Sequence, residues 1–149
     1  MSKLKSAVAV LALLSVAGTA FAAGDVIKER QDKMKAIGGA MGKVLVKMVK
    51  GEEPYDAAKA KAAVETMSTN IKGFTDLFPA GSEKGGDTEA APKIWSDMAG
   101  FKAAAAKLEQ VASVQAANAG KDLDGLKAAV GALGATCKGC HDDYRIKKN

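Results

Sequence analysis

The chain has 149 residues, of which 22 are Lys or Arg and 17 are Asp or Glu, so its formal net charge is +5. This length suits one domain with a single core. Charges of both signs are interspersed, and only 5% of the residues are aromatic. The sequence therefore offers neither a basic tract nor a stacking platform for nucleic acid, and no nucleic-acid partner is expected.

The N-terminal residues 1–22 have the features of a secretory signal peptide. Two lysines precede an uncharged apolar run over residues 7–17, and a small-x-small cleavage motif ends at Ala22. The alternative is an uncleaved membrane anchor, but the run is short for a bilayer span, and no later segment has the roughly 20 apolar residues of a membrane helix. We expect export to the periplasm and a single mature domain, residues 23–149.

The mature sequence predicts four amphipathic helices. Ala and Lys are its most frequent residues, and runs of β-branched or aromatic residues are absent. Apolar residues recur at helical spacings over about residues 25–50, 54–77, 96–119 and 122–146. Residues 79–92 are rich in Gly and Pro without periodicity, which predicts a loop. The pattern predicts an all-α fold, an antiparallel up-down-up-down four-helix bundle.

Capping signals suggest where these helices begin and end. Gly51 is expected to close the first helix, and Pro54 suits the first turn of the second. Ser96 can cap the third helix, and Gly120 ends it. The inner stripe expected of the first helix is Ile27, Arg30, Met34, Ile37, Met41, Val44 and Met48. Arg30 is its only charged member.

The segment CKGCH carries both cysteines and the only histidine of the chain, on the expected inner stripe of the fourth helix. Residues i and i+3 of a helix share a face, so both thiols can add to the vinyl groups on one edge of a porphyrin. C-x-x-C-H is the attachment motif of c-type haem. We predict one covalently attached haem c, held by Cys137 and Cys140, with His141 as the axial iron ligand.

Three other interpretations of this segment fit less well. A structural zinc site needs four protein ligands, and the chain offers only three Cys and His side chains. A thioredoxin-like C-x-x-C opens a helix after a β-strand, whereas this one lies late in a helix. Export would permit a structural disulfide in an apo bundle, which remains the third alternative.

Three segments resemble the cytochrome c' family, a family of four-helix bundles. They are VIKERQDKMKAIGGAMG in the first helix, PKIWSDMAGFKAAA at the start of the third, and CKGCHDDYRIKK near the C-terminus. The resemblance implies that Arg30 and Gln31 lie at the haem edge and that Met34 lies on the distal face. It also implies cofactor contacts for Trp95 and Phe101.

The resemblance places Arg145 on the proximal side, beside His141. The alternative is a basic residue that complements the helix dipole. For Arg30 the residues give independent support, since a buried guanidinium on an apolar stripe needs an anion, which a haem propionate would supply. The alternative is that the stripe frays near the helix start and Arg30 is solvated.

Met34 leaves two functions open. The family resemblance implies five-coordinate iron that binds small gases, nitric oxide and carbon monoxide, and transfers single electrons. In low-spin sister cytochromes of the same bundle, a methionine of this helix is the sixth ligand, which would make the protein a His/Met electron carrier. Met34, Met41 and Met48 recur every seven residues, so a packing role is the default, and we favour the five-coordinate form.

Catalysis and self-association are the remaining questions. The chain has no second histidine and no paired carboxylates of identifiable geometry, so we do not expect an enzyme. Relatives dimerise through the first two helices, and Gly38 and Gly42 would permit close helix approach in such a homodimer. The alternative role of these glycines is packing within one chain. The sequence does not identify a redox partner protein.

Overall fold

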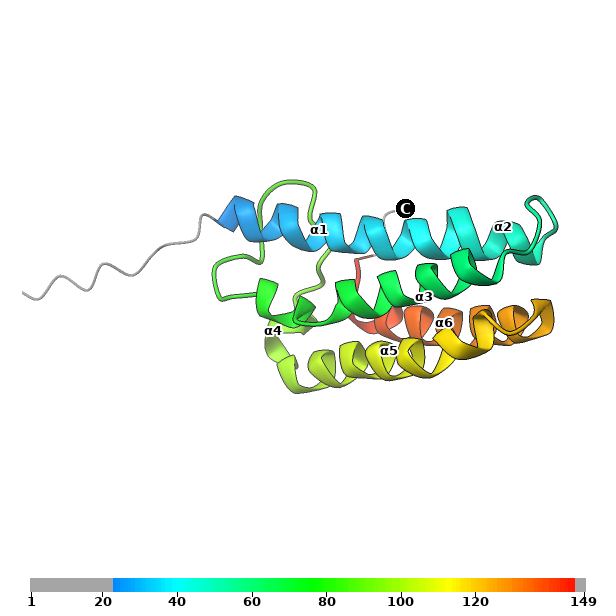
Figure 1. Cartoon of the computed structure of the whole chain (residues 1–149). Coiled ribbons are helices and arrows are strands. Elements are labelled where there is room, and N and C mark those ends of the chain that lie inside the picture. Colours follow the sequence, from blue (N-terminus) through cyan, green and yellow to red (C-terminus); the bar gives the residue numbers. More distant parts are fainter. Residues whose placement is uncertain (1–22, 147–149) are drawn as a thin grey trace, which may run out of the picture.

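Four helical stretches lie side by side and alternate in direction (Figure 1), which confirms the predicted all-α four-helix bundle. The computed structural model describes residues 23–146, so the expected signal peptide lies outside the described residues. The stretches are α1 (Ala23–Gly39) continued by η1 (Ala40–Leu45) and α2 (Val46–Val49), then α3 (Ala57–Ile71), α5 (Met98–Ala119) and α6 (Leu123–Tyr144). No described helix has the length and apolarity needed to cross a bilayer.

The first stretch contains a π-helical turn, η1, between α1 and α2. A π-helix takes up more residues per turn than an α-helix, so the buried face changes register there. Leu45 is fully buried, whereas Val44, expected on the inner stripe, is only half-buried. The expected stripe is therefore buried at Ile37 and again at Met48, but is displaced at the π-turn between them.

Aspartate side chains cap three helix starts, in each case accepting a hydrogen bond from a backbone N–H three residues later. They are Asp56 for α3, Asp97 for α5 and Asp122 for α6. Pro54 therefore precedes the second helix instead of lying in its first turn. Ser96 ends a short helix, α4 (Lys93–Ser96), and does not cap α5. Gly51 and Gly120 follow their helices as expected.

The second long helix is shorter than its periodicity suggested, because α3 ends at Ile71. Gly73 has a φ of +67°, a conformation that costs glycine little, and a 3₁₀ turn, η2 (Phe74–Leu77), follows it. The break turns the chain while keeping both Phe74 and Phe78 buried.

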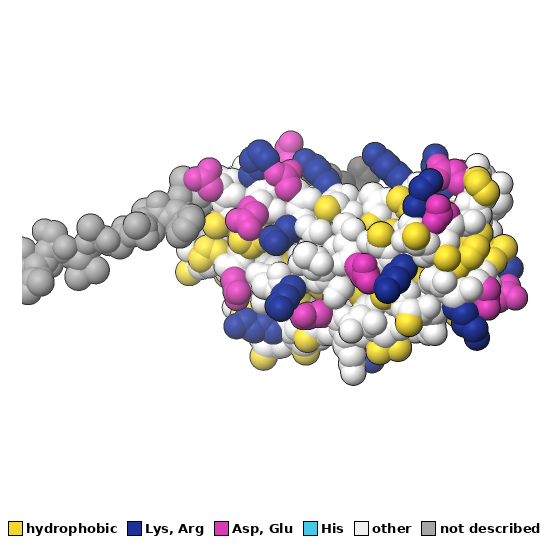
Figure 2. Space-filling model, viewed as in Figure 1, with side chains coloured by type: hydrophobic (Ala, Val, Ile, Leu, Met, Phe, Trp, Pro, Cys, Tyr) yellow, Lys and Arg dark blue, Asp and Glu magenta, His cyan; other side chains and the backbone are white. Residues whose placement is uncertain are grey.

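The core changes in character along the axis of the bundle. Near the α2–α3 and α5–α6 connections it consists of aliphatic and alanine side chains, among them Leu45 and Leu126. At the other end the rings of Phe74, Phe78 and Phe101 pack against one another, with centroids 4.8 to 6.3 Å apart. On the outside, acidic and basic side chains are interspersed over the face shown in Figure 2.

Candidate cofactor site

The CKGCH segment lies in the last two turns of α6, and its reactive side chains meet in one pocket. Cys137, Cys140 and His141 are each half-buried, and both thiols are free. The i, i+3 spacing places the two sulfurs on one face of the helix.

All four helical stretches contribute apolar side chains to this pocket. Met34 and Ile37 come from α1, Ile71 from α3, Phe74 from η2, and Phe101, Ala104, Ala105 and Leu108 from α5. Besides the CKGCH side chains, Met34 is the only one of these that carries an atom able to ligate iron.

The pocket lies where the first and last helices separate. α6 packs along α5 and approaches the first helical stretch mainly at η1 and α2, near the opposite end of the bundle. Beside α1, where α6 lies further away, the pocket is lined by the apolar side chains named above. Two thiols on one helical face, an imidazole one residue further and an apolar pocket lining fit the chemistry of a haem attached through two thioether bonds.

The buried position sets the protonation of the three reactive groups. Burial raises the pKa of Cys140 to about 11, with further contributions from Cys137 and Asp143. Burial also raises the pKa of Cys137. Both groups are therefore thiols at neutral pH, which disfavours thiolate chemistry such as disulfide exchange. Burial, followed by the charge of Arg145, lowers the pKa of His141, so its imidazole is neutral and can donate a lone pair to a metal.

Arg30 is buried, with 3% of its surface exposed, so the alternative of a solvated Arg30 is wrong. It lies outside the pocket lining, and its guanidinium reaches the crossover between η2 and α4. It donates to the Ser82 hydroxyl at 3.2 Å, the Ser82 carbonyl at 2.9 Å and the Thr88 hydroxyl at 2.7 Å. It also lies 4.5 Å from the ring centroid of Phe78. Contact with a propionate stays a prediction.

Three other predicted site residues also lie outside the lining. Gln31 is half-buried on α1. The Trp95 indole donates to the Pro79 carbonyl at 3.2 Å and packs on Phe78. Arg145 pairs with Glu89, with its Nε 2.6 Å from the carboxylate.

The structure brings together five of the predicted site residues: Met34, Phe101, Cys137, Cys140 and His141. Sequence reasoning did not assign the other lining residues to the site. Ile37 was on the predicted inner stripe of the first helix, so the periodicity identified it as buried but could not say that it faces a cofactor.

Comparison with known proteins now decides the family. The family model described as Cytochrome C' matches residues 25–145. Cytochrome c-556 of Agrobacterium fabrum is 52% identical over 89% of this chain and 88% of its own length. Cytochrome c' of Rhodopseudomonas palustris is 40% identical over 98% and 100% of the two chains. The chain belongs to the cytochrome c' family.

Solved cytochrome c' structures have the same fold. The cytochrome c' from Rhodobacter Spheriodes superposes with a TM-score of 0.77 at 36% identity and covers 85% of this chain and 98% of that one. A nitric oxide complex of a cytochrome c prime variant from Alcaligenes xylosoxidans gives 0.74 at 40% identity, with 85% and 97% covered.

Membership of the cytochrome c' family confirms several predictions. Together with the C-terminal cysteine pair, it assigns one covalently attached haem c to the chain. The cytochrome c' family consists of periplasmic haem proteins that are not enzymes.

Proposed function

We propose that this chain is a periplasmic c-type cytochrome in which Cys137 and Cys140 hold the haem and His141 ligates its iron. The observation that carries this proposal is the meeting of these three side chains in one apolar pocket lined by every helical stretch. Each thiol adds across one vinyl group, with its sulfur bonding to one carbon and its proton to the other, so no oxidant is needed. Once bound, the haem supplies single-electron transfer and an iron centre for diatomic ligands.

We propose small neutral gases as the ligands. The side chains that α1, α3, η2 and α5 present to the pocket carry no hydrogen-bond donor, so bound oxygen would gain little there. Nitric oxide and carbon monoxide suit such an apolar face better. Relatives support this choice, because a nitric oxide complex and a carbon monoxide-bound variant of the Alcaligenes xylosoxidans cytochrome c prime are known. In this form Met34 packs and does not bind the iron.

One observation favours a second candidate, a six-coordinate His/Met electron carrier. Met34 lines the same pocket as His141, and its sulfur is the only iron-ligating atom that the other helices contribute. Of the two relatives described above, the more similar is named cytochrome c-556 and the other cytochrome c'. The name of the family therefore does not decide whether Met34 binds the iron.

Acid–acetone extraction tests the attachment. Wild-type protein should keep its visible absorbance in the protein fraction, because thioether bonds survive the extraction. The Cys137→Ala/Cys140→Ala variant should release any haem that it binds. Release of haem from the wild type would contradict the proposed attachment.

Absorption spectra of the ferrous protein, with Met34→Ala and Met41→Ala as a matched pair, test the coordination. Met41 is also half-buried in the first helical stretch but does not line the pocket. For five-coordinate iron, the wild type and both variants should give high-spin spectra that shift on adding nitric oxide or carbon monoxide. A low-spin wild type indifferent to carbon monoxide, made reactive by Met34→Ala alone, would establish the His/Met form.

We also propose that the domain of residues 23–149 forms a homodimer through its first two helices. Gly38 and Gly42 are exposed, and a Cβ atom at either would meet no other atom within 4 Å, so packing within the chain does not explain them. Sedimentation should show a dimer that Gly38→Glu disrupts. Gly131→Glu, at an equally open position on α6, should leave the dimer intact.

We further propose that residues 1–22 are removed on export. Mass spectrometry of the periplasmic protein should then give an N-terminus at Ala23.

A further inference from the structure

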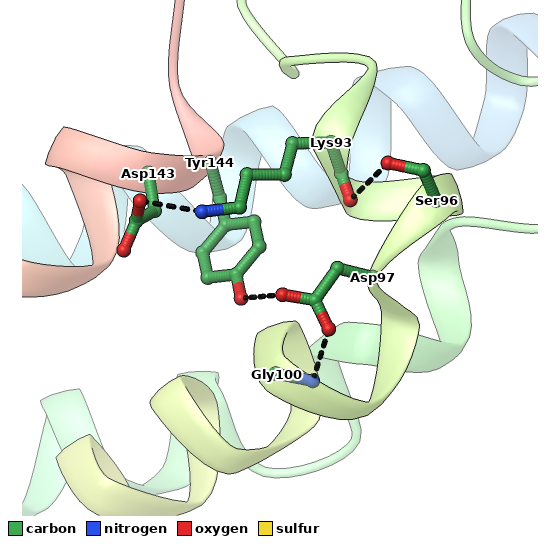
Figure 3. Close-up of polar contacts among 6 residues, drawn as sticks. All are labelled: Lys93, Ser96, Asp97, Gly100, Asp143 and Tyr144. Carbon is green, nitrogen blue, oxygen red and sulfur yellow. Dashed lines mark hydrogen bonds and ion pairs between the residues drawn. The ribbon is translucent and has the colours of Figure 1, made fainter.

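The last turn of α6, which contains Cys140 and His141, is fastened to the start of α5 by Tyr144. This tyrosine is 8% exposed. Its hydroxyl donates to Asp97 Oδ2 at 2.8 Å, and Oδ1 of the same carboxylate accepts from the Gly100 N–H at 3.1 Å (Figure 3). One carboxylate therefore caps α5 and holds the end of α6 at the same time.

Gly100 shows how closely these groups approach one another. A Cβ atom at this position would lie 2.4 Å from both Asp97 Oδ2 and the Tyr144 hydroxyl oxygen. Any other residue would force one of them to move. The absence of a side chain at Gly100 is thus what allows the hydroxyl to reach the carboxylate.

Further contacts hold the same turn. Lys93 Nζ lies 2.6 Å from Asp143 Oδ1 and 5.3 Å from the Tyr144 ring centroid. The Tyr144 carbonyl accepts from the Ala91 N–H at 3.0 Å. The Tyr144 ring packs edge-on against Phe101, with centroids 5.3 Å apart, and Phe101 lines the cofactor pocket.

We propose that Tyr144, Asp97 and Gly100 form a clamp that positions His141 as the axial ligand. The proposal rests on the proposed function, because it concerns the ligand of that same iron. The last carbonyls of a helix lack intrahelical partners, so a C-terminal turn frays unless other groups hold it. Tyr144 is the last residue of α6, and His141 lies three residues before it on the same turn. Fixing the Tyr144 ring therefore restricts the imidazole.

The clamp is tested in the full-length, haem-loaded protein with Tyr144→Phe and Gly100→Ala. The matched control is Tyr55→Phe, which also removes a partly buried hydroxyl bond, to the Ala119 carbonyl at 3.0 Å, but at the opposite end of the bundle. The readouts are the reduction potential and the low-temperature EPR spectrum of the ferric protein. We expect both site-end variants to shift the potential and broaden the EPR signal, and Tyr55→Phe to leave both unchanged.

A haem-loaded, folded Tyr144→Phe with the potential and EPR spectrum of the wild type would overturn the clamp alone. Wild-type protein without covalent haem would overturn the proposed function together with the clamp. If Tyr144→Phe does not fold, Asp97→Asn serves instead, because the amide oxygen can keep the α5 cap while the amide nitrogen, a donor, replaces the oxygen that accepts from the Tyr144 hydroxyl. It should give a smaller change of the same kind, and an unchanged spectrum would again overturn the clamp.

Discussion

Where α2 meets α3 and α5 meets α6, the chain turns through short connections, whereas the opposite end of the bundle carries the long crossover between η2 and α4. At the first end most of the decisive features are local, such as the φ of +73° at Gly51 and the Asp122 cap, and the hydrogen bond from Tyr55 to Ala119 is the exception. At the second end they join segments far apart in the sequence, as in the bonds from Arg30 to Ser82 and Thr88.

The last described residues of the chain also contact a segment far away in the sequence. Residue Arg145 forms an isolated antiparallel bridge with Ala90, and the Ile146 N–H donates to the Glu89 carbonyl at 2.8 Å. The pocket proposed for the cofactor thus lies toward the end of the bundle where the last described residues contact the crossover, and we expect the other end to serve as a scaffold. If this division is right, changes at the two ends should affect different measurements.

The largest expected effect is at the scaffold end. Leu126 is fully buried, so Leu126→Ala should lower the free energy of unfolding by about 2–5 kcal/mol. The absorption spectrum of the folded protein should not change. Urea unfolding and visible spectroscopy check both points, with Val114→Ala as an exposed control expected to stay within about 0.5 kcal/mol. A changed spectrum would break the division between the two ends.

A smaller loss is expected at Arg30. Arg30→Leu removes the donors that satisfy Ser82 and Thr88, and should lower the free energy of unfolding by about 1–3 kcal/mol. The crossover should also become more sensitive to limited proteolysis, because its main anchor is gone. Lys35→Leu, at an exposed position on the same helix, is the control. Equal proteolysis of the two variants would show that Arg30 does not anchor the crossover.

The Asp122 cap should contribute about 1 kcal/mol, since its carboxylate accepts from the Gly125 N–H at 2.7 Å. Asp122→Ala is expected to lose this stability, as measured by urea unfolding, with no change in the spectrum. Asp122→Asn keeps an acceptor and should remain close to the wild type. A large loss in the asparagine variant would point to charge instead of capping.

The smallest effect is a dependence on alkaline pH. The bond to Asp97 raises the pKa of Tyr144 to about 12, above its ordinary value near 10. A group whose pKa is raised on folding stabilises the folded state fully below its unfolded pKa and loses this contribution as pH rises to the folded value. Wild-type stability should therefore fall more steeply than that of Tyr144→Phe between about pH 10 and 12, in urea unfolding followed by circular dichroism. Parallel slopes would contradict the shift.

Helical periodicity was sufficient to predict the bundle, and CKGCH was sufficient to predict the covalent haem. The burial of Arg30 was also foreshadowed, because it interrupts an apolar stripe. Its partners were not, since Ser82 and Thr88 lie more than fifty residues away in a segment without periodicity. Polar contacts of this kind depend on where the crossover comes to lie, which no local pattern encodes.

Helix boundaries failed for a related reason. Ser96 and Pro54 are ordinary capping signals, but Asp97 and Asp56 compete for the same function and accept the hydrogen bonds in the folded protein. The early end of α3 depends on the left-handed conformation of Gly73, which its surroundings select. The aromatic contacts of Tyr144 likewise require α5 and α6 to be placed first.

The π-helical turn η1 has a consequence for how the length of this chain can vary. A π-turn holds one residue more than the α-helical turn it replaces, so η1 absorbs a one-residue insertion without breaking the helix. The helices on either side keep facing their own partners, the pocket for Met34 and the aliphatic core for Met48. A one-residue deletion within Ala40–Leu45 would restore a continuous α-helix there. A one-residue deletion in α1 between Met34 and Gly39 would instead rotate the preceding residues by about 100° and turn Met34 away from the pocket.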